Sequence, residues 1–364
     1  MKLLHLADLH IGKRVHEFSM LSEQKHVLWQ ILDYVKQYKP DGVLIAGDVY
    51  DRSVPGVEAV RLFDTFLAEL HQTGTKVFLI SGNHDSAERI QFAGDILEES
   101  GVYLAGSCED ELKHVTLQDE YGEVVIWLLP FMKSAVVSDY LNRNFSEKAR
   151  HVLVAHQFVT WNGKAEESDS EYHSIGGLDE IDVSLFQEFD YVALGHLHGA
   201  QKIGRETVRY AGSPLKYSFS EVHQKKSVTL VELKEKGVTE IRQLLLTPIH
   251  DMRKIKGPLA ALLSKEVVEA APADDYIHAT LTDEEELYDA VGQLRDKYPN
   301  LMRLEFENSR TKAVQETDGM SAQWKDASPF QLFLEFYEQQ NGVPMSEEEE
   351  SLLKQFLTEG GELD

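Results

Sequence analysis

Five short polar blocks in the first 200 residues are built from side chains that bind metal ions. In chain order they are Asp8-Leu9-His10, Gly47-Asp48-Val49-Tyr50-Asp51-Arg52, Gly82-Asn83-His84-Asp85, His156 and Gly195-His196-Leu197-His198. Any one of them, taken alone, is most simply a turn or a packed histidine. Five such blocks in one chain make that interpretation poor, because carboxylate, amide and imidazole groups without a thiolate suit Mn²⁺, Fe or Zn²⁺. The large share of oxygen favours Mn²⁺.

The number of candidate ligands points to two metal ions. The blocks supply seven of them: Asp8, His10, Asp48, Asn83, His156, His196 and His198. Seven ligands exceed what one octahedral ion with open positions can use, whereas two ions roughly 3.5–4 Å apart that share a carboxylate can accommodate them. Asp48 is the natural bridge because a carboxylate has two oxygens. Gly47 and Gly82 permit close approach of the backbone at these turns.

The blocks need elements that bring them together, and the sequence supplies alternating strands and helices. Each block begins at or near the end of an apolar run typical of a strand. These runs are residues 3–7, 43–46, 77–80, 152–155 and 191–194. Apolar residues also recur at helical spacing over residues 28–38 and 60–70. This alternation predicts an α/β fold, in which ligands collect at the carboxyl ends of the strands.

The composition limits the class of protein. With 364 residues, 42% of them hydrophobic and 27% charged, the chain is long enough for two or three folded units and too apolar for disorder. Cys108 is the single cysteine, so neither an intramolecular disulfide nor a four-thiolate zinc site can form. No apolar run approaches the roughly 18 residues that a membrane span needs. We therefore expect a soluble cytoplasmic protein.

The net charge raises a question about partners. Against 36 basic residues stand 62 acidic ones, which leaves a formal charge of −26. Proteins that hold nucleic acid by neutralising phosphates usually carry a basic excess or a basic face. Either this chain binds no polyanion, or bound cations and a partner protein supply the positive field.

The pattern changes near residue 250, which predicts a domain boundary. Residues 250–272 show no clear period, whereas residues 276–306 have the pattern of a compact β-α-β unit. The polar stretch 309–324 is typical of a linker. After it the sequence predicts two helices, each opening with the residues of a capping box, at Ser328 and at Ser346.

The five blocks resemble the pattern of the calcineurin-like metallophosphoesterases, which is D-x-H, G-D-x-x-D, G-N-H-[DE], H and G-H-x-H in that order. Within that superfamily, residues 189–198 and 210–219 are similar to the SbcD family. Its members are nuclease subunits of bacterial SbcC–SbcD complexes and relatives of the Mre-type double-strand-break nucleases. The similarity covers nearly the whole chain and is strongest over residues 1–230.

The resemblance implies a four-layer α-β-β-α sandwich with a small α+β capping domain and a C-terminal helix pair. The nuclease domain would span residues 1–250, and a DNA-facing β-α-β capping domain residues 251–310. A linker over 311–327 would lead to a helix pair over 328–364 that binds the coiled coil of an SMC-like ATPase. An acidic pair facing a basic coiled-coil base would explain part of the net charge.

The resemblance also implies a role for each site residue. One metal would be bound by Asp8, His10, Asp48 and His198, and the other by Asp48, Asn83, His156 and His196. His84 is not a ligand in this assignment and would stand near the scissile phosphate as acid or charge stabiliser, oriented by Asp85. Asp51 and Arg52 would support the ligands or face the phosphate, although Asp51 could equally be a structural turn residue.

The activity implied by the resemblance is DNA end processing. We expect a Mn²⁺-dependent 3′-5′ exonuclease on double strands and an endonuclease on single strands and hairpins, with Mg²⁺ as a substitute metal. The chain would form a homodimer within a heterotetramer with the ATPase. It would act near the nucleoid in repair, recombination and replication.

Two other functions compete with this one. Another two-metal phosphoesterase, such as a phosphoprotein or cyclic-nucleotide hydrolase, would use similar ligands. Phosphoprotein phosphatases usually have Gly after the Asp-Arg of the second block and Glu after Gly-Asn-His, where this chain has Ser53 and Asp85. A non-catalytic scaffold would have lost ligands, and none is missing.

Overall fold

The structure is a computed structural model of the chain. It describes residues 1–108, 111–141, 145–169, 171 and 180–309, together with 330, 333, 334, 337, 344–346, 349, 350 and 353. The predicted linker, 311–327, lies outside the described residues, and so does most of the predicted helix pair, 328–364.

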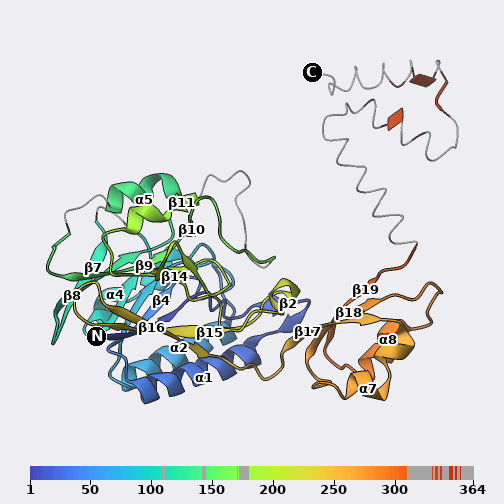
Figure 1. Cartoon of the computed structure of the whole chain (residues 1–364), viewed down its shortest axis with the longest axis horizontal. Coiled ribbons are helices and arrows are strands. Elements are labelled where there is room, and N and C mark those ends of the chain that lie inside the picture. The colour runs from blue at the N-terminus through green and yellow to red at the C-terminus, as the bar shows by residue number, and fades with distance from the viewer. Residues whose placement is uncertain are drawn as a thin grey trace.

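Two six-stranded sheets form the centre of the body (Figure 1). The first has the order β16 (Thr239–Leu245), β15 (Ser227–Leu233), β1 (Lys2–Leu6), β4 (Gly42–Ala46), β5 (Lys76–Ile80) and β6 (Val102–Ala105). The second has the order β13 (Gln201–Ile203), β14 (Arg205–Tyr210), β12 (Tyr191–Gly195), β9 (Arg150–His156), β8 (Gly122–Leu129) and β7 (Lys113–Asp119). All five strands predicted from the apolar runs are present.

The central strands of each sheet are parallel. In the first sheet β1, β4, β5 and β6 run the same way, and in the second β8, β9, β12 and β14 do. Their carboxyl ends therefore meet at one edge of each sheet, as the sequence predicts. The antiparallel strands β15 and β16 flank β1 and are joined by the predicted hairpin at Lys234–Gly237.

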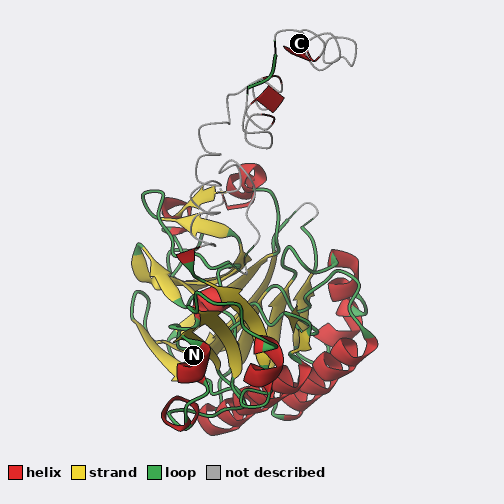
Figure 2. Cartoon of the chain, turned by 90° about the vertical axis from the view of Figure 1, so that its right-hand side faces the viewer, coloured by secondary structure: helices red, strands yellow, loops and turns green. Residues whose placement is uncertain are grey.

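The body has four layers. Leu44 and Phe78 of the first sheet pack with Ile126 and Val154 of the second, which makes a dry core between the sheets. The helices α1 (Leu21–Tyr38) and α2 (Val57–Gln72) cover the outer face of the first sheet. The outer face of the second carries α5 (Ser134–Leu141) and the 3₁₀ turn η1 (Val183–Phe186). Figure 2 shows the long helices along the outside of the strands, and the predicted α-β-β-α sandwich is confirmed.

Strands buried on both faces need continuous apolar runs, which is why β4 and β9 have no alternating pattern. Short elements complete the body: β2 (Arg14–Val15), β3 (Phe18–Ser19), α3 (Ala87–Gln91), α4 (Gly94–Glu98), β10 (Phe158–Thr160), β11 (Glu180–Asp182) and the 3₁₀ turn η2 (Phe219–Glu221). Within the part of the chain that the structure describes, no helix is both long and apolar enough to cross a membrane.

A smaller lobe follows the body and is drawn in orange at the right of Figure 1. Its parallel sheet contains β17 (Met252–Gly257), β18 (Tyr276–Leu281) and β19 (Leu301–Phe306), with the helices α6 (Leu259–Leu262), α7 (Lys265–Val268) and α8 (Ala290–Arg295). The sequence predicts only the β18-α8-β19 part. It misses β17 because Lys254 and Lys256 interrupt the apolar pattern, and it misses α6 and α7 because each is a single turn.

One capping box predicted near the C-terminus lies partly among the described residues. Ser346 Oγ donates to Glu349 Oε2 at 2.7 Å, and the backbone N–H of Glu349 donates back to Ser346 Oγ at 3.4 Å. The hydroxyl of Tyr337 also donates to Glu349 Oε1. The reciprocal pair confirms that capping box.

Candidate metal centre

The loops that follow five parallel strands bring the predicted ligands into one cluster. Asp8 and His10 follow β1, Asp48 follows β4, and Asn83 follows β5. The second sheet contributes three histidines: His156, His196 and His198. Asp8 Oδ1 accepts a hydrogen bond from the backbone N–H of His196 at 2.9 Å, which joins the two sheets at the centre of the cluster.

The ligand atoms fall into overlapping groups. Asp8, His10 and His198 can place one ligand atom each within 4.8 Å of one another, and so can Asp8, Asp48 and His156. Asp48 Oδ2 lies 3.6 Å from His10 Nε2 and 3.4 Å from His156 Nε2, so it stands between the two groups. This intermediate place is what a bridging carboxylate requires.

An amide and a histidine extend the second group. Asn83 Oδ1 lies 2.9 Å from His156 Nε2 and 3.2 Å from His196 Nδ1. His84 also falls within 4.8 Å of a group, with His10 and Asp48, although the resemblance gives it no ligand role. All seven predicted ligands therefore lie together, and His84 lies beside them.

The donor set fits divalent cations. Asp8 Oδ2 and His10 Nδ1 are buried and have no hydrogen-bond partner among the described residues, apart from any metal. His10 Nε2 and His198 Nε2 face each other at 3.1 Å, so at most one can serve as donor to the other. Buried polar atoms normally have partners, and a cation would provide one for these acceptors.

The electrostatics of the cluster show how closely its charges interact. Burial raises the pKa of Asp8 well above its ordinary value, and the nearby Asp48 carboxylate adds to this effect. Burial also opposes the charge of Asp48, but the surrounding histidines outweigh it and hold the pKa of Asp48 below its ordinary value. Burial alone would lower the pKa of His156, whereas Asp48 and Asp8 raise it to about 9. Without a cation, two buried carboxylates thus depend on protons for compensation.

The backbone of the cluster is strained. Asp8, His10, Asp48 and His196 have φ values of 53°, 44°, 49° and 114°, a region that residues other than glycine seldom adopt. Each such residue costs on the order of 1–3 kcal/mol and persists only where the surroundings enforce it. Here hydrogen bonds between loops do so, from Asp8 N to Gly47 O and from His10 N to Asp48 O. Strain at four of seven predicted ligands is typical of a functional site.

Two glycines make the close approach possible. A Cβ at Gly82 would lie 2.1 Å from Asp48 Oδ1, and one at Gly47 would lie 2.4 Å from His156 Nδ1. Gly47 also has a positive φ of 83°. The predicted need for glycine at these turns is therefore confirmed.

His84 and Asp85 belong to the turn after β5. The backbone N–H of His84 donates to Asp48 Oδ1 at 2.9 Å, and His84 Nδ1 lies 2.9 Å from the carbonyl oxygen of Asp51. The Asp85 carboxylate accepts from the backbone N–H groups of Val49, Tyr50 and Gly82. Asp85 therefore ties the β5 turn to the loop after β4, and it acts on His84 through that shared backbone.

The two further candidates of the second block differ in exposure. The Asp51 side chain is 15% exposed and pairs with Lys13 Nζ at 2.8 Å. The Arg52 side chain is 79% exposed and contacts Asp51 at 3.8 Å. Asp51 is thus held in the wall of the site, whereas Arg52 extends into solvent beside it.

Sequence reasoning misses the residues that support the first loop. Gln24 of α1 is buried and donates to the carbonyl oxygens of Leu9 and His10. The hydroxyl of Tyr217 donates to Leu9 O and also bonds Gln24. Tyr217 lies in the stretch 210–219 that carries the family similarity, which is the one signal for it in the sequence.

A basic groove begins beside the cluster and reaches the smaller lobe. Its volume is about 460 Å³. Its basic lining residues are Lys13, Arg14, His16, Lys254, His278 and Arg303. Asp169 and Glu171 also line it, so the groove is basic on balance but not throughout. Lys13 connects it to the cluster through the pair with Asp51.

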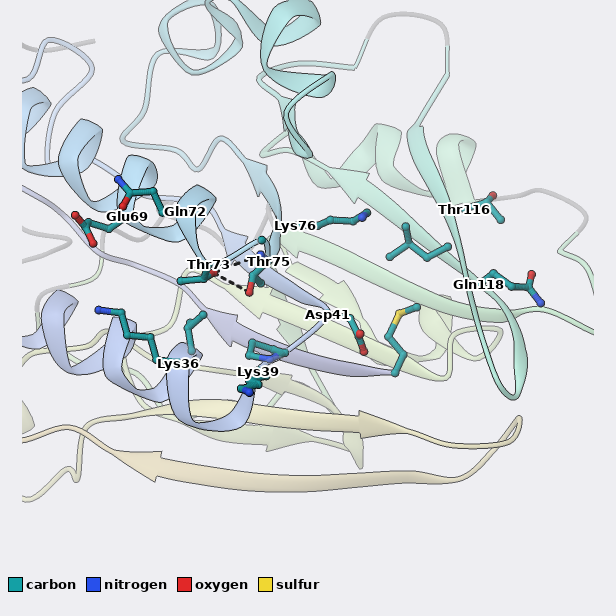
Figure 3. Close-up of a pocket in the computed structure, with 15 residues that line it drawn as sticks. Lys36, Lys39, Asp41, Glu69, Gln72, Thr73, Thr75, Lys76, Thr116 and Gln118 are labelled. Atoms are coloured by element: carbon teal, nitrogen blue, oxygen red, sulfur yellow. Dashed lines mark hydrogen bonds between the residues drawn. The ribbon is translucent and has the colours of Figure 1, made fainter.

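A larger cavity, of about 1050 Å³, lies at the other end of the strands (Figure 3). Its lining includes Lys36 and Lys39 from the end of α1 and Lys76 from the start of β5. None of the seven predicted ligands lines it. Size therefore does not identify the functional site in this protein.

The glycine contacts generate a prediction. Gly82→Ala should strip most of the bound metal, because its Cβ would overlap Asp48, which stands in both metal groups. Gly56→Ala is the matched control, since a Cβ there meets nothing within 4 Å. Elemental analysis of dialysed protein measures both variants. Equal metal content in Gly82→Ala and wild type would contradict the placement of Asp48.

Comparison with known proteins places the chain in a family. Residues 1–200 match the family described as calcineurin-like phosphoesterase, and residues 248–341 match one described as type 5 capsule protein repressor C-terminal domain. A solved structure titled as a dimetal phosphatase from Danio rerio covers 68% of this chain and 99% of its own, with 10% identity and a TM-score of 0.39. A score that low adds nothing to the assignment.

Curated relatives carry the assignment further. A protein of Staphylococcus saprophyticus, named as the SbcD subunit of the nuclease SbcCD, is 30% identical over 324 residues, which is 84% of this chain and 84% of the relative. A protein of the same name from Staphylococcus epidermidis is 28% identical over 324 residues, 84% of this chain and 85% of its own. The chain therefore belongs to the SbcD family of nucleases, a branch of the calcineurin-like phosphoesterases.

Proposed function

We propose that the chain is a two-metal DNA phosphodiesterase, a Mn²⁺-dependent 3′-5′ exonuclease on double strands and an endonuclease on single strands and hairpins. The observation that carries the proposal is the buried cluster of seven ligand side chains at the ends of five parallel strands. Two divalent cations bound there would supply a nucleophile near neutral pH and neutralise the charge that develops on the phosphoryl oxygens.

The proposed division of ligands follows the groups in the cluster. Asp8, His10 and His198 would hold one ion, and Asn83, His156 and His196 the other. Asp48 would contact both, in keeping with its distances of 3.6 Å to His10 and 3.4 Å to His156. An oxygen-rich set without thiolate supports Mn²⁺ as the metal and Mg²⁺ as a weaker substitute.

His84 is the proposed proton donor. If its Nδ1–H donates to the Asp51 carbonyl oxygen, the proton that can be exchanged with the substrate is on Nε2. The leaving group of a phosphodiester is a poor one, and general acid catalysis of its departure contributes typically 10²–10⁴-fold. Asp85 and Asp51 would position His84, and Arg52 would meet the phosphate from the exposed rim.

The basic groove supports DNA as the substrate. It extends from Lys13 beside the cluster to Lys254 and Arg303 of the smaller lobe, so a bound polyanion would have phosphates along a path and not at one point. A cyclic nucleotide has a single phosphate and would leave most of that path empty. The groove also answers the charge question, because a local basic strip exists in a chain of net charge −26.

The partners are proposed on the names of the relatives and on exposed surfaces. The relatives are named as subunits of SbcCD, which supports an SMC-like ATPase as partner, in DNA repair, recombination and replication. A homodimer is supported by exposed apolar side chains that flank the site loops, Val54 and Val57 near Arg52, and Phe92 and Ile96 after Asp85. We propose that the assembly acts in the cytoplasm near the nucleoid.

Two variants separate metal binding from chemistry. His84→Ala should lower cleavage of a p-nitrophenyl phosphodiester in Mn²⁺ by about 10²–10⁴-fold while two metals stay bound, because His84 is not a proposed ligand. Asp48→Ala should lower the occupancy of both metals. Elemental analysis and steady-state rates measure the two effects. Wild type should be less active in Mg²⁺ and inactive after chelation.

Two outcomes would overturn these roles. Loss of both ions from His84→Ala would make His84 a ligand. Full activity of chelator-treated, metal-free wild type would remove the two-metal proposal altogether.

The groove yields a test of the substrate. Lys254→Ala should weaken binding of a labelled duplex and lower the slope of log affinity against log salt by about 1, since one phosphate contact is lost. Hydrolysis of the small phosphodiester should not change. Lys36→Ala, which removes a lysine from the cavity at the opposite end, is the control. If both variants bind duplex equally well, the groove does not carry DNA.

The C-terminal segment yields a test of the partner. Deletion of residues 326–364 should leave hydrolysis of the small phosphodiester intact but abolish co-purification with the SMC-like ATPase and the stimulation of duplex degradation by ATP. Stoichiometric co-purification of the truncated protein would contradict the assignment. Loss of small-substrate hydrolysis would show instead that the segment belongs to the folded body.

A further inference from the structure

A buried ion pair stands behind one of the proposed metal ligands. Glu221, at the end of η2, is fully buried, and Lys226 is nearly so. Lys226 Nζ donates to Glu221 Oε2 at 2.6 Å and to Ser213 Oγ and the carbonyl oxygen of His198, each at 2.9 Å. In the sequence Lys226 looks like half of a weak basic patch, Lys225-Lys226. The structure buries it.

The second oxygen of this carboxylate meets the histidine ring. Glu221 Oε1 lies 3.5 Å from His198 Nδ1. The other ring nitrogen, Nε2, lies in the ligand cluster, 3.1 Å from His10 Nε2. The imidazole of His198 therefore has a carboxylate on one side and the candidate metal position on the other.

The arrangement selects a tautomer. Glu221 is held as an acceptor by the ammonium of Lys226, so the ring nitrogen that faces it must carry the proton. A neutral imidazole with its proton on Nδ1 has its lone pair on Nε2, which is the atom available to a metal. A carboxylate that accepts from the outer nitrogen of a ligating histidine fixes the ring and makes it a stronger ligand.

We propose that Glu221, held in place by Lys226, is a positioning residue that orients His198 and sets its tautomer for metal binding. The inference rests on the proposed function, because it assumes that His198 is a ligand. It assigns a role to a segment, residues 213–226, that contains none of the five polar blocks.

A purely structural role explains the pair less well. Burying two charges costs about as much as their attraction returns, and apolar residues of similar volume are often as good for stability. The Glu221 carboxylate also has one oxygen for each neighbour, with Oε2 on Lys226 and Oε1 on His198. An ion pair that only filled space would not need that second contact.

Glu221→Gln tests the inference because it changes the chemistry and keeps the shape. The amide oxygen should stay on Lys226, which offers only donors, so the NH₂ group should face His198. A donor at that place makes Nδ1 the acceptor and moves the ring proton to Nε2. The ¹⁵N and ¹H NMR signals of labelled His198, assigned by their loss in His198→Gln, should report this change in metal-free protein.

Metal affinity is the second measurement. Calorimetric titration with Mn²⁺ should show binding at the first metal position weakened by about 10–100-fold in Glu221→Gln. Glu23→Gln is the matched control, because Glu23 is an equally buried carboxylate that bonds a different histidine, His250, at 2.6 Å. Its Mn²⁺ affinity should equal that of wild type.

A second variant covers the case in which Glu221→Gln fails to fold. Glu221→Leu combined with Lys226→Met removes both charges at once and should fold, but should still weaken Mn²⁺ binding because His198 loses its acceptor. An unchanged His198 tautomer with unchanged Mn²⁺ affinity in either folded variant would overturn the inference. Failure of wild type to bind Mn²⁺ would instead overturn the proposed function, and the tautomer measurement in metal-free protein keeps the two outcomes apart.

Discussion

The whole arrangement depends on the close packing of loop ends from two sheets around buried carboxylates. The loops after β4, β5 and β12 approach so closely that a Cβ at Gly82 or Gly195 would lie only 2.1 Å or 1.9 Å from a neighbouring oxygen. That approach buries Asp8 and Asp48 together and forces several ligands into left-handed backbone conformations. Such a cluster is unfavourable as a piece of bare protein, and divalent cations are the group that would balance it.

Much of the site could be predicted from the sequence because its signals are local. Each ligand lies within four residues of the end of an apolar strand, and the carboxyl ends of parallel strands share an edge. The four-layer fold follows from the same runs, which are apolar throughout because both of their faces are buried. The order and spacing of the polar blocks predict the cluster for these reasons.

The rest of the site depends on distant contacts, which a single sequence does not show. Lys13 and Arg303 line one groove although 290 positions separate them. Lys226 has the same composition signal as any exposed lysine, and only the fold reveals that it is buried against Glu221. Strand β17 is missed for a related reason, because its lysines form one polar face of a sheet whose partner strands come later in the chain.

The most direct test of the two-metal site is anomalous X-ray diffraction from a crystal grown with Mn²⁺, collected on both sides of the manganese absorption edge. The account predicts two anomalous peaks roughly 3.5–4 Å apart, with Asp48 between them and His198 Nε2 at one of them. A single peak, or peaks outside the cluster of strand ends, would contradict it.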